Sequence, residues 1–289
     1  MQILTPHLSN KQVSFAPLDL PQTAQSPSLL ELARHYSVPS AFFEERIRSV
    51  THSFGSVDNN NGYSSWFHYL CKNITTQQSG NGGKWVSDPR PGSSILPQMD
   101  GTWNRSGFFL RWASLEEANP DRDPEVTLIC FQAPEFLRKR LVQIPAASFC
   151  SGAILDPHCL FVVILSELSR QMDHTTWDVS DVFRDVEMKM LDASHEREAF
   201  TGLHNIFKHI IFLQEGSEAI LLTLNAFTIC HQKSLGCASD DEKAAAQATH
   251  DALLQVETGF QAVNLRIKSL EKRMQNIISL VSQPRPVLQ

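Results

Sequence analysis

The chain has 289 residues, of which 42% are hydrophobic and 19% are charged. This is enough apolar material for one large core or two smaller ones, so we expect a globular chain and not a disordered one. The net charge of −6 provides no overall attraction to nucleic acid or to an anionic membrane surface, and we expect no nucleic-acid partner.

The cysteines and the apolar runs indicate the cellular compartment in which the protein is expected. The six cysteines include no CxxC pair and lie at positions 71, 130, 150, 159, 230 and 237. Several lie in apolar runs, where a free thiol behaves as a small hydrophobe, and no secretory signal is visible at the start. The longest apolar runs, 159–165 and 219–230, are shorter than the about 20 residues that a bilayer span needs. We therefore expect reduced cysteines, a cytoplasmic location and no membrane span.

The first quarter of the chain is expected to change from disorder to helix. Residues 1–27 contain four prolines and no sustained periodicity, which indicates a disordered lead-in. SLLELARHY (28–36) has helical spacing. Val38 precedes Pro39, a context that disfavours helix, so we expect a break and then a second helix, SAFFEERIRSVTHSFG (40–55), which ends at Gly55.

Strands are expected next. Residues 56–107 are rich in Asn, Gly, Ser and Pro around one apolar piece, WFHYLCKNI, which indicates strand and loop. GFFLRWAS (107–114) and EVTLICFQ (125–132) are rich in aromatic and β-branched residues and are separated by a loop, so we predict an antiparallel pair. Residues 28–150 would then form a small mixed α/β domain.

Helices are expected from there on. After a short helix, EFLRKRLVQI (135–144), Asp156 is a good N-cap and Pro157 suits the first helical position. We predict helices at about 157–173, 177–195, 198–233 and 241–283, and the first two can be continuous. The predicted fold class is α+β and mostly α: the small N-terminal domain, then a region of long packed helices (151–289) that ends in a coiled-coil, stalk-like helix.

The last helix carries an uninterrupted apolar seam with steps of three and four residues. Its members are Leu253, Val256, Phe260, Val263, Ile267, Leu270, Met274, Ile277 and Val281. This is the a/d stripe of a coiled coil over about four heptads. The preceding helix has its own stripe, formed by Leu203, Ile206, Ile210, Leu213, Ile220, Leu224 and Phe227. An antiparallel hairpin of the two helices and self-association through the seam both explain the pattern, and the sequence leaves both open.

Motifs for catalysis are missing, so we expect no enzyme. The sequence contains no GxxxxGK[ST], HExxH or GxSxG pattern. His204 and His209 are five residues apart, which splays them on a helix. His158-Cys159 and Cys230-His231 are sequence neighbours that point in different directions, so we expect no zinc site there.

Two charged groups remain as candidates. Asp178, Asp181 and Asp185 are spaced i, i+3 and i+7 and lie on one helical face, where carboxylate oxygens suit magnesium. The alternative is a solvated face in which Asp178 and Asp181 favour the positive end of a helix. After position 265 the basic residues are opposed by Glu271 alone, and they are Arg266, Lys268, Lys272, Arg273 and Arg285. This basic end suits the negative end of a helix dipole or a weak contact with an anionic surface.

Four stretches together resemble the cytosolic region of the fungal CorA-like divalent-cation transporters. They are LARHYSVPSAFFEERIRSVTHSFG, DPHCLFVVILSELSRQMDHTTWDVSDVFRDVE, LHNIFKHIIFLQEGSEA and LEKRMQNIISLVSQ. The resemblance implies an α/β cytosolic domain followed by long helices, the last of which continues as a stalk into the membrane. It also implies pentamers around a pore and magnesium sensed between subunits, with Asp178, Asp181 and Asp185 as candidate ligands.

The chain departs from this family at its end. Where the family has an apolar span and a Gly-Met-Asn tripeptide, the sequence reads QPRPVLQ, and Pro284 and Pro286 would end the helix. We therefore expect a membrane-less, non-catalytic CorA-like module that is regulatory through association with itself or with a full-length transporter. No cofactor is expected apart from magnesium as a regulatory ion. The alternative is a helical scaffold that has lost the ion chemistry.

Overall fold

The computed structural model describes residues 11–16, 31, 33–47, 52–59, 62–78, 83–87, 98, 102–112, 126–143, 153, 155–190, 196–236 and 240–281. It confirms the predicted fold class, with a small mixed sheet and long helices. Two compact units are present. Unit 1 comprises Met1–Leu70, Arg105–Leu168 and Ala219–Thr258, and unit 2 comprises Cys71–Asn104, Ser169–Glu218 and Gly259–Gln289.

The main sheet belongs to unit 1. Its five strands lie in the order β1 (Lys11–Ala16), β7 (Val126–Phe131), β6 (Trp103–Trp112), β3 (Gly62–Lys72) and β2 (Ser53–Asn59). The β6–β7 pair is antiparallel, with Phe109 opposite Ile129, and this confirms the predicted pairing. β2 and β3 form an antiparallel hairpin, whereas β1 pairs in parallel with β7.

Both faces of this sheet are covered, because successive side chains of a strand point to opposite faces. On one face Phe42 of α2 (Ser40–Ile47) packs against Phe109 and Phe131. On the other face Phe67 meets Phe108 and also Phe161, which comes from the next long helix. The strands are accordingly apolar on both sides, and β7 is buried along its whole length.

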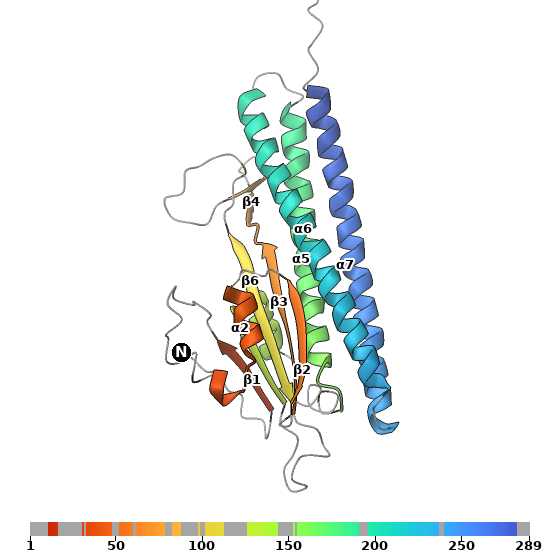
Figure 1. Ribbon diagram of the computed structural model, residues 1–289. Helices are drawn as coiled ribbons and strands as arrows, with labels where there is room; N and C mark the ends of the chain where they lie inside the picture. The colour runs from red at the N-terminus through yellow and green to blue at the C-terminus, as the bar shows by residue number, and fades with distance from the viewer. Residues whose placement is uncertain are drawn as a thin grey trace, which may run out of the picture. The chain divides into compact units, whose positions relative to one another are not determined.

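Three long helices follow α3 (Glu135–Gln143) and lie side by side (Figure 1). They are α5 (Cys159–Met190), α6 (Glu196–Leu235) and α7 (Asp240–Val281). The predicted helices at 157–173 and 177–195 are thus one continuous helix up to Met190. Each long helix contributes one part to unit 1 and another to unit 2, so the compact units divide the chain differently from the predicted boundary near residue 150.

The apolar seam of α7 is covered within the chain. Seven of its members are buried, and they are Leu253, Val256, Phe260, Val263, Ile267, Leu270 and Met274. Ile277 is half-buried, and the side chain of Val281 lies outside the described residues. The stripe of α6 from Leu203 to Phe227 is buried as well. This is what packing between helices of one chain requires, and self-association stays a prediction.

One helix segment within the described ranges is long and apolar enough to cross a membrane by length and composition. It is Phe200–Leu235 in α6. An 18-residue window within it has a mean hydropathy of 1.2, and 44% of that window is buried inside the protein. Core helices of soluble proteins are often as long and as apolar, so this is weak evidence for a span. No membrane span was expected from the sequence.

Two expectations for the N-terminal part are wrong. Residues 11–16 lie in the predicted disordered lead-in but form β1, because their backbone pairs with the edge of β7, a strand more than 100 residues away. The predicted helix 40–55 ends at Ile47, and residues 53–59 form β2 instead. Phe54 and Gly55 pair there with Phe67 and Trp66, so a long-range partner overrides the local helical spacing.

Candidate functional site

The three predicted magnesium ligands of α5 converge on one lysine in unit 2. Lys84 is the first residue of β5 (Lys84–Val86), which pairs with β4 (Thr76–Gln78). Its Nζ lies 3.0 Å from Oδ1 of Asp178 and 2.9 Å from Oδ2 of Asp181. Its main-chain N–H donates to Oδ2 of Asp185, at 2.7 Å. The structure therefore places two of the carboxylates on the ammonium group of Lys84 and the third on its main-chain N–H.

The lysine is held in its charged form. Hydrogen bonds to Asp181 and then to Asp178 raise the pKa of Lys84 above its usual value. The side chain of Lys84 is 31% exposed, so water reaches the contact and weakens the attraction. Two exposed side chains of α5 lie near the same carboxylates: Arg184 is 3.6 Å from Asp181, and His174 is 3.4 Å from Asp178. The acidic face is thus partly neutralised from within the chain.

Gly83 allows β5 to approach α5 this closely. A Cβ at this position would lie 3.0 Å from Oδ2 of Asp185, which is tighter than ordinary packing. The sequence gives no signal that connects Lys84 with Asp178, because the two are 94 positions apart. The motif NGGKW shows only that a loop precedes a strand residue.

The predicted basic end of α7 is largely paired with acidic side chains in unit 2. Arg266 pairs with Asp173 and also lies over the ring of Trp177, at 4.4 Å. Lys268 pairs with Glu218 at 3.0 Å, and Arg273 pairs with Glu187 at 3.2 Å. Lys272 is exposed, and Arg285 lies outside the described residues. These pairs leave less positive charge for an anionic surface than the sequence suggests.

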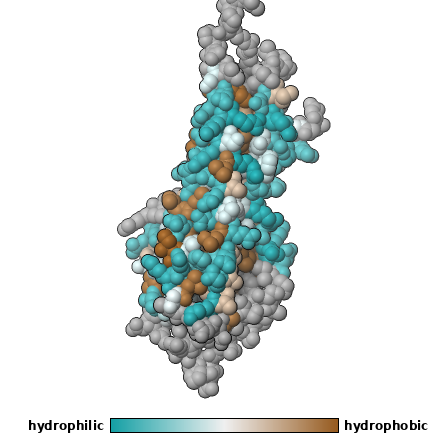
Figure 2. All heavy atoms as spheres, turned by 90° about the vertical axis from the view of Figure 1, so that its right-hand side faces the viewer, coloured by the Kyte–Doolittle hydropathy of each residue, from teal (hydrophilic) through white to brown (hydrophobic). Residues whose placement is uncertain are grey.

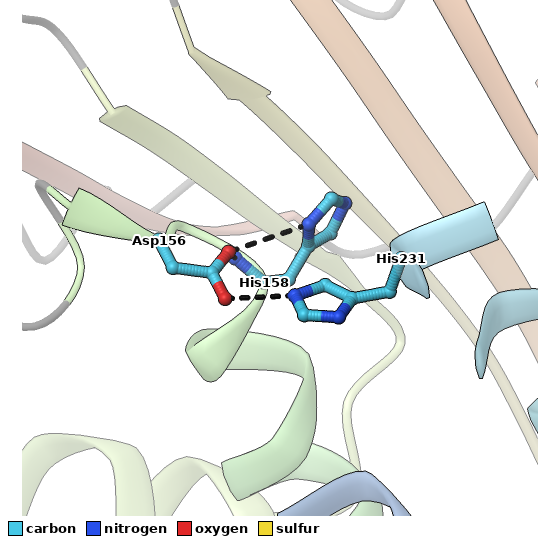
Figure 3. A group of neighbouring side chains, drawn as sticks. All are labelled: Asp156, His158 and His231. Atoms are coloured by element: carbon cyan, nitrogen blue, oxygen red, sulfur yellow. Dashed lines mark hydrogen bonds and ion pairs between the residues drawn. The ribbon is translucent and has the colours of Figure 1, made fainter. Parts of the chain in front are cut away.

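A second cluster lies in unit 1 and was missed by sequence reasoning. Asp156 caps α5 as predicted, because its Oδ1 accepts a hydrogen bond from the main-chain N–H of His158, at 3.1 Å. Its Oδ2 lies 2.8 Å from Nε2 of His231 on α6, and Nδ1 of His158 lies 3.4 Å from Oδ1 (Figure 3). All three side chains are buried. The sequence argument compared each histidine only with the cysteine beside it. The contact that forms the cluster joins the start of α5 to α6, which are far apart in the sequence.

Aromatic rings enclose this cluster. The edge of Trp112 meets the ring of His158 with centroids 4.8 Å apart, and Phe227 lies 5.2 Å from the same ring. Oγ of Ser65, also buried, lies 3.2 Å from Nε2 of His158. The ring of His250 stacks on that of His231, at 5.8 Å. The polar atoms are therefore held in a nearly dry environment.

The charges of the cluster follow from this burial. Burial alone would raise the pKa of Asp156, but hydrogen bonds with His158 and His231 outweigh it and hold the pKa well below its usual range. Burial lowers the pKa of His158, and the contact with Asp156 offsets this only in part. An ionised carboxylate thus faces a neutral imidazole. Within the described residues, these three form the one group of three or more His, Cys, Asp or Glu side chains whose ligand atoms all lie within 4.8 Å of one another.

Comparison with known proteins gives a partial structural likeness. No family model matches the sequence, and no curated protein matches it. The soluble domain of CorA from Methanocaldococcus jannaschii is similar with 11% identity and a TM-score of 0.47, over 92% of this chain and 86% of that chain. The complete CorA magnesium transporter of the same organism is similar with 10% identity and a TM-score of 0.46, over 93% and 70%. A likeness of this size does not establish the family or the function of this chain.

Proposed function

We propose that this chain is a non-catalytic, cytosolic CorA-like module that responds to magnesium at the acidic face of α5. The observation that carries the proposal is the convergence of Asp178, Asp181 and Asp185 on Lys84. Magnesium and the ammonium group of Lys84 would compete for the same carboxylate oxygens. The sequence resemblance to the CorA-like transporters supports the choice of this ion.

The chemistry of the face suits such a competition. Mg²⁺ takes one or two carboxylates and keeps several of its waters, so it needs oxygen ligands that solvent reaches. The side chains of Asp178 and Asp181 are 15% and 33% exposed. A hydrated divalent ion can therefore approach without an opening of the core, and its double charge favours it over a single ammonium.

Exchange of the lysine for the ion would change the attachment of one strand. Lys84 is the residue that ties β5 to α5 through both its side chain and its main chain. When Nζ leaves Asp178 and Asp181, the bond from the main-chain N–H to Asp185 remains as the tether. Magnesium would thus loosen the start of β5 while it neutralises the acidic face of α5, and both effects lie within unit 2.

Assembly with a second copy, or with a CorA-like transporter, is the second part of the proposal. Because the α7 seam is buried in the chain, association would use other apolar residues of the long helices. Leu222 on α6 and Leu265 on α7 are 72% and 69% exposed. Figure 2 shows a mostly hydrophilic face with hydrophobic residues in separate patches. Small separate patches suit a weak, regulated contact better than a permanent one.

The alternative function is a helical scaffold without ion chemistry. It is favoured by the same lysine, because an acidic face that is already paired with Lys84 and Arg184 needs no metal for its stability. In that case Lys84 is a structural counter-ion, and the module binds its partner whether or not magnesium is present.

Magnesium titration of matched variants separates the two functions. Lys84→Met keeps the apolar stem of the side chain and removes the competing charge, so magnesium affinity measured by calorimetry should rise several-fold above that of the unmodified protein. Asp178→Asn with Asp181→Asn should abolish the heat of binding. Light scattering with and without millimolar magnesium reports assembly. If Lys84→Met binds magnesium no better than the unmodified chain, the competition is wrong and the scaffold is favoured.

A further inference from the structure

The buried cluster in unit 1 has the donor set of a metal site. Asp156 offers a carboxylate oxygen, His158 offers Nδ1 and His231 offers Nε2, and these atoms lie within 4.8 Å of one another. Ligands that each lie about 2.0 to 2.1 Å from a tetrahedral zinc ion are about 3.3 Å apart. The 3.4 Å contact of Nδ1 of His158 with Oδ1 of Asp156 already has this spacing. Nε2 of His231 contacts the other carboxylate oxygen, Oδ2, at 2.8 Å, so the carboxylate would have to turn for one oxygen to serve both histidines.

The partners of Asp156 also leave room for a cation in the cluster. In the part of the chain that the structure describes, the side chain of Asp156 meets two histidines and no lysine or arginine. A buried carboxylate without a cationic partner is costly. This differs from the acidic face of unit 2, where Lys84 supplies the positive charge.

The surroundings of His158 orient it as metal-bound histidines are usually oriented. The ring nitrogen of such a histidine that does not bind the metal donates its proton to a nearby oxygen. The other ring nitrogen then has a lone pair that binds the metal. Nε2 of His158 lies 3.2 Å from the buried Oγ of Ser65. With the proton on Nε2 donated to Ser65, Nδ1 would have a lone pair for an ion, whereas without an ion a proton on Nδ1 would face Asp156.

The surroundings of His231 differ from those of His158. It is almost fully buried, stacks on His250, and its Nδ1 has no hydrogen-bond partner. An unsatisfied nitrogen in a dry core costs free energy in any state of the cluster. Binding of an ion at Nε2 would add a strong interaction to a side chain that otherwise makes one hydrogen bond, the one to Asp156.

We propose that Asp156, His158 and His231 form a buried site for one transition-metal ion of the zinc class. Two imidazoles and one carboxylate suit Zn²⁺ and Co²⁺, whereas Mg²⁺ prefers oxygen ligands. Because the site is enclosed by Trp112 and Phe227, its role is structural: the ion would join the start of α5 to the last turns of α6 within unit 1.

Metal content and thermal unfolding test the site on the whole chain. The protein is stripped with a chelator, incubated with Zn²⁺ or Co²⁺ and desalted. About one equivalent should remain, and Tm should rise by several degrees. His231→Gln keeps a donor that reaches Asp156, and Asp156→Asn keeps the helix cap, so both should fold and both should lose the retained ion and the rise in Tm.

His250→Gln is the matched control, because His250 stacks on the cluster without offering a ligand, and its retained metal should stay unchanged. X-ray absorption of the zinc form should show nitrogen and oxygen ligands and no sulfur. The proposal is overturned if the unmodified chain retains no ion even after refolding with zinc. It is also overturned if His231→Gln retains as much as the unmodified chain, or if sulfur appears among the ligands. Magnesium binding at unit 2 does not affect either result.

Discussion

Gly55 lies directly against the indole ring of Trp66. A Cβ built on Gly55 would overlap Cζ2 of Trp66, far inside contact distance. The indole is fixed by its own hydrogen bond, since Nε1 of Trp66 donates to Oε2 of Glu45 at 3.2 Å. A helix stop was predicted at this glycine, but its role is to leave room for a buried ring on the neighbouring strand.

Replacement of this glycine should therefore be costly. Gly55→Ala should lower the free energy of unfolding by about 1 to 3 kcal/mol, because an added methyl group overpacks the core. Urea unfolding measures the change. Gly236→Ala is the control, since its nearest neighbour would be the carbonyl oxygen of Lys233 at an ordinary 3.6 Å. Equal effects of the two substitutions would contradict the packing explanation.

The α7 seam gives a second prediction. Ile267→Asp and Leu270→Asp each place a charge at a buried position, so each should destabilise the chain by more than about 3 kcal/mol and lower its helicity. Circular dichroism during thermal unfolding measures this.

Leu265→Asp is the matched control on the same helix, because Leu265 is exposed. It should leave helicity unchanged, while any self-association seen by light scattering should weaken. Unchanged helicity in the two buried variants would mean that the seam is not part of the core.

The pH dependence of stability should contain a contribution from His52. Burial is the largest cause that lowers the pKa of His52 from 6.5 to about 4, against the opposing hydrogen bond to the carbonyl of Leu70. Between these values the unfolded chain binds a proton that the folded chain does not. The stabilising contribution is therefore complete above pH 6.5 and is lost as the pH falls towards 4, by up to about 3 kcal/mol.

His52→Gln tests this, because the amide keeps a donor for the carbonyl of Leu70 and does not titrate. Urea unfolding between pH 4 and pH 7 should show a shallower loss of stability for the variant. Parallel curves for both proteins would show that His52 does not contribute.

Thiol reactivity gives a further prediction. Burial raises the pKa of the Cys130 thiol far above its usual value, so the thiolate that reacts with alkylating agents is absent in the folded state. Peptide mass spectrometry should find Cys130 unmodified after brief treatment, and the half-buried Cys159 and Cys230 modified faster. Early modification of Cys130 would show that β7 opens readily.

Periodic patterns in the sequence determined the helical half of this protein. The seam from Leu253 to Met274 and the cap at Asp156 are local signals, because helix geometry repeats every 3.6 residues and the cap acts on the next turn. The β6–β7 pair was also visible, since its two strands are rich in strand-forming residues and close in sequence.

Tertiary structure alone decided the partners of the charged and polar side chains. Lys84 meets Asp178 across 94 positions, and Asp156 meets His231 across 75. No local spacing encodes such contacts, because they arise only when separate elements pack and bring buried or half-buried polar atoms within hydrogen-bond distance. For the same reason the sequence predicted disorder where β1 forms and helix where β2 forms. A strand is stabilised by the neighbouring strand of the sheet, and the local sequence of the strand does not contain this information.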